Sequence, residues 1–206
     1  MATAYESFLE RYESGKIPWN QELPPPEVIE LVAGLRPGRG LDLGCGYGRS
    51  ALYLAQKGWQ ADGVDFVAQA IHEASARAEQ AGLSAQVQFH TGSVAAMPFL
   101  TESYDLAIDV GCMHSLTAEQ QQGYRDELMR LLPEGAIYLL FAHLRAEDAA
   151  AGNAADEEDK PRGIMEREIK ELFGPGFVLE RVELGWTQVE DRPPWQSGWF
   201  WWRREE

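Results

Sequence analysis

Residues 41–49 combine an acid, three alternate glycines and the start of a helix, and their spacing suits a bound ligand. Glycine allows the positive φ angles of a tight strand-to-helix turn, and it leaves no Cβ between a ligand and the backbone. A carboxylate two residues before the first glycine suits a ligand that carries an amino group and positive charge. We therefore expect a nucleoside of this kind, contacted by Asp42, Gly44, Cys45, Gly46 and Gly48.

The same glycines could belong to a dinucleotide site, which has the pattern G-x-G-x-x-G and faces a pyrophosphate. Arg49 stands where that pattern needs its third glycine. A nicotinamide oxidoreductase is therefore disfavoured, although glycine-rich turns also occur in α/β proteins for structural reasons alone. Binding of NAD would restore this interpretation.

A second strand pattern, residues 60–65, ends in Asp65 about 20 residues after the first acid. In nucleotide-binding α/β folds a carboxylate at this distance accepts hydrogen bonds from the ribose hydroxyls. Asp65 is therefore the strongest candidate for ribose binding, and we expect the adjacent Phe66 to contact the cofactor as well. The alternative is that Asp65 caps the following helix, because Asp satisfies free amide groups at a helix start.

The sequence Asp109-Val110-Gly111-Cys112-Met113-His114 follows another apolar strand and supplies a second group of candidates. Ligands of open α/β sheets bind at the carboxyl ends of the strands. His114 has the only side chain in this turn with an ordinary pKa near neutrality, so it could accept a substrate proton or position an anion. We expect His114 and Asp109, together with Tyr12 from the N-terminal segment, to be catalytic, and Asp109 also to contact the cofactor. The alternative for His114 is that it caps or braces the helix that begins near Thr117.

Aromatic residues near the two ends of the sequence could cover such a site. Tyr5, Phe8 and Tyr12 follow at helical spacing, and Trp19 comes after them. They predict a short helix and loop that offer aromatic faces to a positive charge, or else a stripe that packs on its own domain. Trp195, in a predicted loop before the last strand, could line a small apolar pocket or pack in the core.

Alternating strand and helix patterns from residue 40 onward predict a doubly wound α/β sheet. The predicted strands are residues 41–43, 60–65, 87–90, 104–110, 136–141, 177–184 and 198–203, the last one antiparallel at the sheet edge. The predicted helices are residues 50–57, 67–81, 117–132 and 165–172. The acidic, glycine- and alanine-containing stretch 145–162 is predicted to be a mobile connector; it would suit an active-site lid or a solvated surface segment.

Composition narrows the class of protein. A length of 206 residues with 45% hydrophobic content predicts one folded domain. The net charge of −15 disfavours nucleic acid and anionic membranes as partners. The absence of a long apolar run and the acidic N-terminus predict a soluble, cytoplasmic protein. Two cysteines allow neither a disulfide framework nor a four-ligand zinc site, so we expect no metal.

Several separated segments resemble the class I S-adenosylmethionine-dependent methyltransferases. Residues 41–49 resemble their motif I, and Gly63-Val64-Asp65 resembles their motif II. Residues 12–19 and the D-x-G-x-x-H turn at 109–114 resemble a small-molecule subgroup: the thiopurine, thiol/halide and tellurite-resistance methyltransferases.

The resemblance implies one Rossmann-like domain over residues 1–206, with a mostly parallel seven-stranded sheet, an antiparallel last strand and helices on both faces. It implies S-adenosylmethionine as cofactor and S-adenosylhomocysteine as product. Asp42 and the glycines would surround the methionine portion, and Asp65 would bind ribose. Residues 1–26, with Trp19, would cover the cofactor.

One departure from the family concerns the adenine contact. Many class I enzymes carry an acid after the third strand, whereas this sequence has Gly92-Ser93-Val94. The Ser93 hydroxyl and the Val94 backbone amide could supply the contact instead.

Methyl transfer from a sulfonium is an in-line displacement, so the protein chiefly aligns donor and acceptor. We expect a soft acceptor such as a thiol, a halide or a chalcogen oxyanion, with His114 as the candidate base and Tyr12, Trp19 and Trp195 as walls. An O- or N-methyltransferase of a small metabolite, or a non-catalytic cofactor-binding module, are the alternatives.

Overall fold

A computed structural model of the chain describes residues 4–14, 17, 20–145, 163–188 and 194–206. Seven strands form one sheet in the order β3-β2-β1-β4-β5-β7-β6. The strands are β1 Arg39–Leu43, β2 Gln60–Asp65, β3 Val87–Thr91, β4 Leu106–Val110, β5 Ile137–His143, β6 Phe177–Thr187 and β7 Trp195–Arg204. The helices are α1 Ala4–Ser14, α2 Pro26–Ala33, α3 Arg49–Gln56, α4 Ala68–Gln80, the 3₁₀ helix η1 Met113–Ser115, α5 Ala118–Leu131 and α6 Glu166–Phe173.

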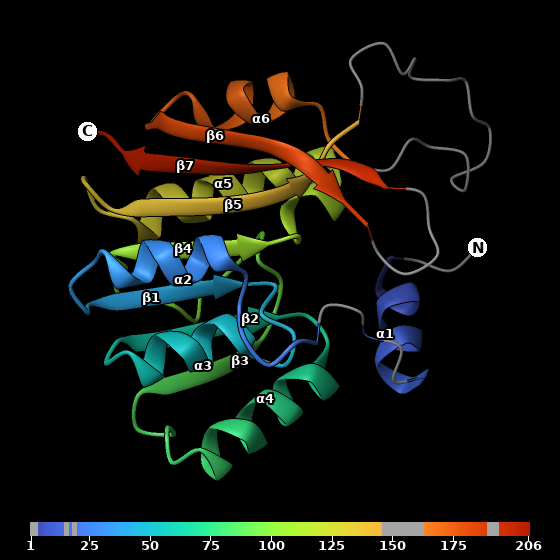
Figure 1. Cartoon of the computed structure of the whole chain (residues 1–206), viewed down its shortest axis with the longest axis vertical. Coiled ribbons are helices and arrows are strands. Elements are labelled where there is room, and N and C mark those ends of the chain that lie inside the picture. The colour runs from blue at the N-terminus through green and yellow to red at the C-terminus, as the bar shows by residue number, and fades with distance from the viewer. Residues whose placement is uncertain (1–3, 15–16, 18–19, 146–162, 189–193) are drawn as a thin grey trace.

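The order of the strands confirms the doubly wound sheet and corrects the place of its last strand. Strands β1 to β5 pair in parallel, and β7 is antiparallel to both of its neighbours. The prediction that the last strand lies at the sheet edge is wrong, because β7 lies between β5 and β6 (Figure 1). The reason is burial: the middle of β7 is buried throughout, whereas β6 is largely exposed and suits an edge.

Helices cover both faces of the sheet, as predicted. Helices α5 and α6 pack in one core cluster with Leu41, Tyr138 and Phe200. Helices α2 and α3 pack in the other with Leu106 and Leu139. Figure 1 shows α2 and α3 in front of the sheet and α5 behind it. Among the described helices, none has the length and apolar content needed to cross a membrane.

The aromatic tract of β7 serves both of these cores. Trp199 and Trp201 belong to the cluster of α2 and α3, whereas Phe200 and Trp202 belong to the cluster of α5 and α6. Successive strand residues point to opposite faces, and here each face is covered. Both sets of side chains in the tract are therefore buried.

β5 and β7 both extend further than predicted, and their added residues pair with each other at the carboxyl end of the parallel strands. β5 continues to His143, which pairs with Ser197 of β7. β7 begins at Trp195, opposite Thr187 of β6, so the prediction of a loop at Trp195 is wrong. Antiparallel pairing stabilises both ends. His143 and Trp195 therefore lie at the carboxyl end of the parallel strands, where ligands bind in such sheets.

Candidate functional site

The glycine turn after β1 is fixed to the end of β2 by backbone hydrogen bonds. The amides of Gly44 and Cys45 both donate to the Val64 carbonyl, at 2.8 and 3.0 Å. The amide of Gly46 donates to Oδ2 of Asp65 at 2.9 Å. The φ angles of Gly44, Gly46 and Gly48 are +68°, +53° and +79°, so this turn requires the conformational freedom of glycine, as the spacing predicted.

Two of these glycines also make room for other parts of the protein. A Cβ on Gly44 would lie 2.5 Å from Cβ of Cys112, in the turn after β4. A Cβ on Gly48 would lie 2.5 Å from the Phe89 ring of β3. The sequence pattern indicated an approach of a ligand to the backbone, whereas these contacts give Gly44 and Gly48 a packing role on the side where a Cβ would point.

Asp42 and Arg49 place opposite charges in one pocket. Oδ2 of Asp42 accepts a hydrogen bond from the Ala51 amide at 3.0 Å and so braces the start of α3. Asp42 is only 3% exposed, and burial raises its pKa to about 7. Arg49 begins α3, and burial lowers its pKa while the Asp42 charge raises it. The sequence analysis did not assign Arg49 to the site, although a cation seven residues after a candidate acid is a visible signal.

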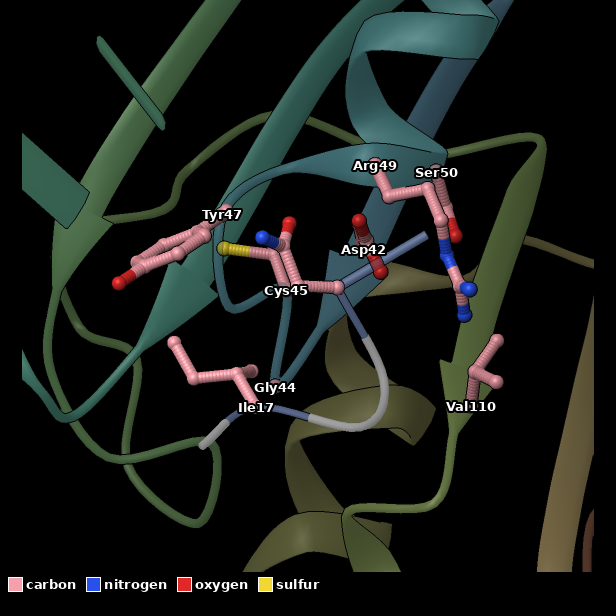
Figure 2. Close-up of a pocket in the computed structure, with 9 residues that line it drawn as sticks. Ile17, Asp42, Gly44, Cys45, Tyr47, Arg49, Ser50 and Val110 are labelled. Carbon is pink, nitrogen blue, oxygen red and sulfur yellow. The ribbon is translucent and has the colours of Figure 1, made fainter. Parts of the chain in front are cut away.

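The pocket beside the glycine turn has the chemical character of an amino-acid binding site. Figure 2 shows Asp42 at its centre, Arg49 reaching past Asp42 towards Val110, and Ile17 near Cys45. A carboxylate and a guanidinium lining one pocket are complementary to a ligand that carries both an ammonium and a carboxylate. The residues present therefore fit the methionine portion of S-adenosylmethionine.

Asp65 stands at the end of β2 and holds two turns with its two oxygens. Oδ2 accepts the Gly46 amide, and Oδ1 accepts the Val67 amide, both at 2.9 Å. Val67, not Asp65, is the N-cap residue of α4, and no side chain caps that helix. The alternative that Asp65 is the N-cap of this helix is therefore wrong. Burial raises the pKa of Asp65. An ionised carboxylate has about four acceptor positions, so these bonds leave room for ribose hydroxyls.

The loop after β3 lies next to Asp65. The amide of Gly92 donates to the Asp65 carbonyl at 3.0 Å. The Ser93 side chain is exposed, and its Oγ accepts the Ala95 amide at 3.2 Å. The Val94 side chain is buried in the core, which leaves its backbone as the group that could face an adenine.

The N-terminal segment packs over the glycine turn. Tyr12 is buried, and its ring centroid lies 5.2 Å from that of Tyr47. Arg77 of α4 donates to the Asn20 side chain at 2.9 Å and lies 4.6 Å from the Tyr47 ring. These contacts place Tyr12 beside the cofactor pocket. The predictions for Trp19, for the side chains of Tyr5 and Phe8, and for residues 146–162 lie outside the described part of the chain.

Asp109 is enclosed by the turn that follows it. It has no exposed surface, and its carboxylate accepts the amides of Cys112 and Met113 at 2.7 and 3.0 Å and the Tyr124 hydroxyl at 2.8 Å. Burial raises the pKa of Asp109 to about 6. This placement differs from the direct catalytic and cofactor contacts that we expected. Asp109 instead shapes the turn that carries His114.

His114 lies in the 3₁₀ turn η1, next to the end of β5. Its ring lies 4.8 Å from the His143 ring at an interplanar angle of 86°, and its Nδ1 accepts the His143 amide at 3.4 Å. Burial, and next the neighbouring His143, lower the pKa of His114 to about 3. His114 does not cap α5, because Thr117 does so through the predicted capping box with Gln120. The structure therefore leaves His114 available for the site.

His143 and Trp195 complete an aromatic group around His114. The His143 ring lies 4.8 Å from Trp195 and 5.4 Å from Phe141. The sequence analysis missed His143 because the predicted strand ended at Phe141. A histidine two residues after an apolar strand was the available signal.

The two groups of site residues lie on neighbouring strands. β1 and β4 are paired, with Leu43 opposite Asp109, and Gly44 packs against Cys112. The pocket of Asp42 and Arg49 and the His114 turn therefore stand side by side at the carboxyl end of the sheet. This is the arrangement that a transfer reaction between a bound donor and a second substrate requires.

Comparisons with known proteins identify the family of the chain. Residues 41–135 match the family described as a methyltransferase domain. The chain is 31% identical over 166 residues to the 2-heptyl-1-hydroxyquinolin-4(1H)-one methyltransferase of Mycobacteroides abscessus, covering 80% of this chain and 70% of that protein.

Solved structures share the fold. TehB from Haemophilus influenzae superposes with a TM-score of 0.73 at 19% identity, over 95% of this chain and 67% of that one. The N-methyltransferase NodS from Bradyrhizobium japonicum, solved with S-adenosyl-L-homocysteine, gives 0.68 at 16% identity, over 87% and 85%. From the family match, the identity to a known methyltransferase and the fold, the chain belongs to the S-adenosylmethionine-dependent methyltransferases.

Proposed function

We propose that this chain methylates a soft nucleophile on a small molecule, a thiol first, and a halide or chalcogen oxyanion next. The observation that carries the proposal is the placement of His114, a neutral imidazole within an aromatic group at the carboxyl ends of β4 and β5. Soft nucleophiles need little acid–base assistance. The resemblance of the D-x-G-x-x-H turn to thiol, halide and tellurite methyltransferases supports the same class.

The residues of the chain act chiefly by positioning. S-adenosylmethionine supplies the methyl group as a sulfonium. Asp42 and Arg49 would hold its ammonium and carboxylate, and Asp65 would orient the ribose. The N-terminal segment 1–26 would cover the cofactor and exclude water. Fixing donor and acceptor in line can account for roughly 7–11 kcal/mol of the barrier.

A second candidate is methylation of an oxygen or nitrogen on a planar heteroaromatic compound. The Mycobacteroides abscessus relative is named for a 1-hydroxyquinolinone, which carries an N-hydroxyl on such a ring. Trp195, Phe141 and the imidazole of His143 offer flat faces to a substrate of that shape.

The test is production of S-adenosylhomocysteine by the purified protein. The acceptor panel contains iodide, bisulfide, aromatic thiols, tellurite, a 1-hydroxyquinolin-4-one, catechols and amines, with a reaction lacking acceptor as control. Turnover confined to the soft acceptors supports the first proposal, and turnover on the N-hydroxyl compound supports the second. Saturable binding of S-adenosylhomocysteine without turnover on any acceptor would favour a binding module.

A further inference from the structure

Two histidines meet where the acceptor would bind, and they are chemically unlike. His114 comes from η1 after β4, and His143 is the last residue of β5. Their rings stand edge to face with centroids 4.8 Å apart. Neither ring has a carboxylate partner among the described residues, so neither is oriented as in a histidine–carboxylate pair.

The backbone fixes the tautomer of His114. The amide of His143 donates to Nδ1 of His114 at 3.4 Å, so Nδ1 acts as an acceptor. In a neutral imidazole the other nitrogen then carries the proton. Nε2 of His114 is therefore an N–H donor, and His114 is poorly suited to remove a proton from a substrate.

His143 has the complementary property. Its Nδ1 is buried and has no hydrogen-bond partner in the described ranges. Buried polar atoms normally find partners, so an unpartnered ring nitrogen at a ligand-binding edge calls for an explanation. The groups that face His143 are the His114 imidazole, the Phe141 and Trp195 rings and the paired residue Ser197. None of them carries a fixed charge.

We propose that His143 is a catalytic residue which takes the acceptor's proton through a ring nitrogen, while His114 donates its Nε2–H to the acceptor. This inference rests on the proposed methyl transfer. It assigns the role of base to His143, which lies outside the D-x-G-x-x-H turn at residues 109–114. It also makes His114 a hydrogen-bond donor that holds the acceptor in place.

The step balances as a single displacement. The X–H bond of the acceptor breaks, and its proton goes to Nε2 of His143, the ring nitrogen that is not enclosed. The electron pair left on X forms the X–CH₃ bond, while the pair of the breaking S–CH₃ bond stays on the donor sulfur. The imidazolium then loses its proton to water, so each turnover releases one proton.

The environment of the pair selects the class of acceptor. Burial lowers the pKa of His143, so the residue that takes the proton is a weak base. Proton transfer is efficient when the pKa values of donor and acceptor are close. The pair therefore suits acidic X–H groups, such as aromatic thiols and N-hydroxy heteroaromatics. It does not suit aliphatic alcohols or simple phenols.

The first experiment distinguishes the removal of a proton by His143 from the packing of its aromatic ring against the acceptor. In His143→Phe the aromatic face and the backbone amide remain, and the ring nitrogens are lost. Turnover of an aromatic thiol below its own pKa should fall about 10²- to 10⁴-fold, and the loss should shrink as pH rises through the pKa of the thiol. Iodide, which has no proton to lose, should show a much smaller loss. Equal losses for iodide and the protonated thiol would overturn the proposal, as would no loss for either.

The second experiment tests the donor role of His114. Gln can place an N–H near the position of Nε2, whereas Ala cannot. His114→Ala should lower turnover about 10²- to 10³-fold, and His114→Gln should restore most of it. If Gln is as inactive as Ala while both variants bind S-adenosylhomocysteine normally, His114 is the base and the assignment fails. His72→Gln, at an exposed position on α4, is the matched control. Failure of methyl transfer itself would appear in the wild type, with no product from any acceptor.

Discussion

The buried carboxyl of Asp42 should make the affinity for the cofactor depend on pH, and its raised pKa gives the direction of that dependence. The carboxyl has a pKa of about 7 because it is buried, against an ordinary value of 3.8. Only its charged form attracts an ammonium. Below pH 7 the free protein holds a proton on Asp42 that must leave when the ligand binds. Affinity for S-adenosylhomocysteine should therefore fall as pH falls.

The magnitude follows from linkage between the proton and the ligand. If only the charged form binds, the apparent Kd is multiplied by one plus the ratio of protonated to ionised Asp42. With a pKa of about 7, the affinity should fall about 25-fold between pH 7.5 and pH 5.5. The limiting slope is tenfold per pH unit.

Calorimetric titration with S-adenosylhomocysteine across this range measures both Kd and proton release. Below pH 7 the released proton appears as a difference in heat between buffers of unlike ionisation enthalpy. Asp42→Asn should bind more weakly at pH 7.5 and lose most of the slope. A wild-type Kd that is flat from pH 7.5 to 5.5 would refute the reasoning. A slope that persists in Asp42→Asn would assign the proton to another carboxyl, Asp109 first.

Asp42→Asn should weaken cofactor binding, but it should increase the stability of the free protein. A raised pKa means that the contribution of Asp42 to stability is full below about pH 4 and is lost as pH rises through about 7. The shift corresponds to at most about 4 kcal/mol above pH 7. Asn can still accept the Ala51 amide. Asp42→Asn should therefore raise the melting temperature at pH 8, and a lowered one would contradict the burial argument.

Three further substitutions test the scaffold around the site. Arg77→Ala releases Asn20 and should weaken S-adenosylhomocysteine binding about threefold to tenfold, as the loss of one hydrogen bond with a net contribution of about 0.5–1.5 kcal/mol would; unchanged affinity would separate this contact from the pocket. Tyr124→Phe leaves Asp109 short of one donor and should lower the free energy of unfolding by about 1–3 kcal/mol in urea titrations, with a lower kcat. Gly44→Ala forces a side chain into a positive-φ position 2.5 Å from Cys112 and should abolish cofactor binding, which wild-type affinity in a folded variant would disprove.

The signals for the proposed cofactor half of the site are local, so the positions of its residues could be predicted. A tight turn after β1 needs glycines at fixed positions, and an acid at the end of β2 is visible within one strand. Asp42 and Asp65 therefore stand where the sequence placed them. Their hydrogen bonds to the amides of Ala51, Gly46 and Val67 could not be predicted, because they depend on how the strand ends meet.

The acceptor half depends on pairing between distant segments. β5 reaches His143 only because β7 pairs with it from Ser197 to Arg203. Apolar periodicity ends at Phe141 and gives no signal of that extension. The burial of Asp109 could not be predicted for a similar reason. Tyr124, whose hydroxyl donates to the Asp109 carboxylate, comes from the separate helix α5.

The two cysteines of the chain lie in the glycine turn and in the turn that carries His114, and this has a consequence for self-modification. Cys112 packs against Gly44, and Sγ of Cys45 would lie 3.0 Å from a Cβ on Gly63. Burial raises the pKa of both thiols well above their ordinary value. Only a thiolate attacks an electrophilic methyl group efficiently. Two thiols that would lie next to the proposed methyl donor are thus held in the protonated form, which would not compete with the substrate for the methyl group.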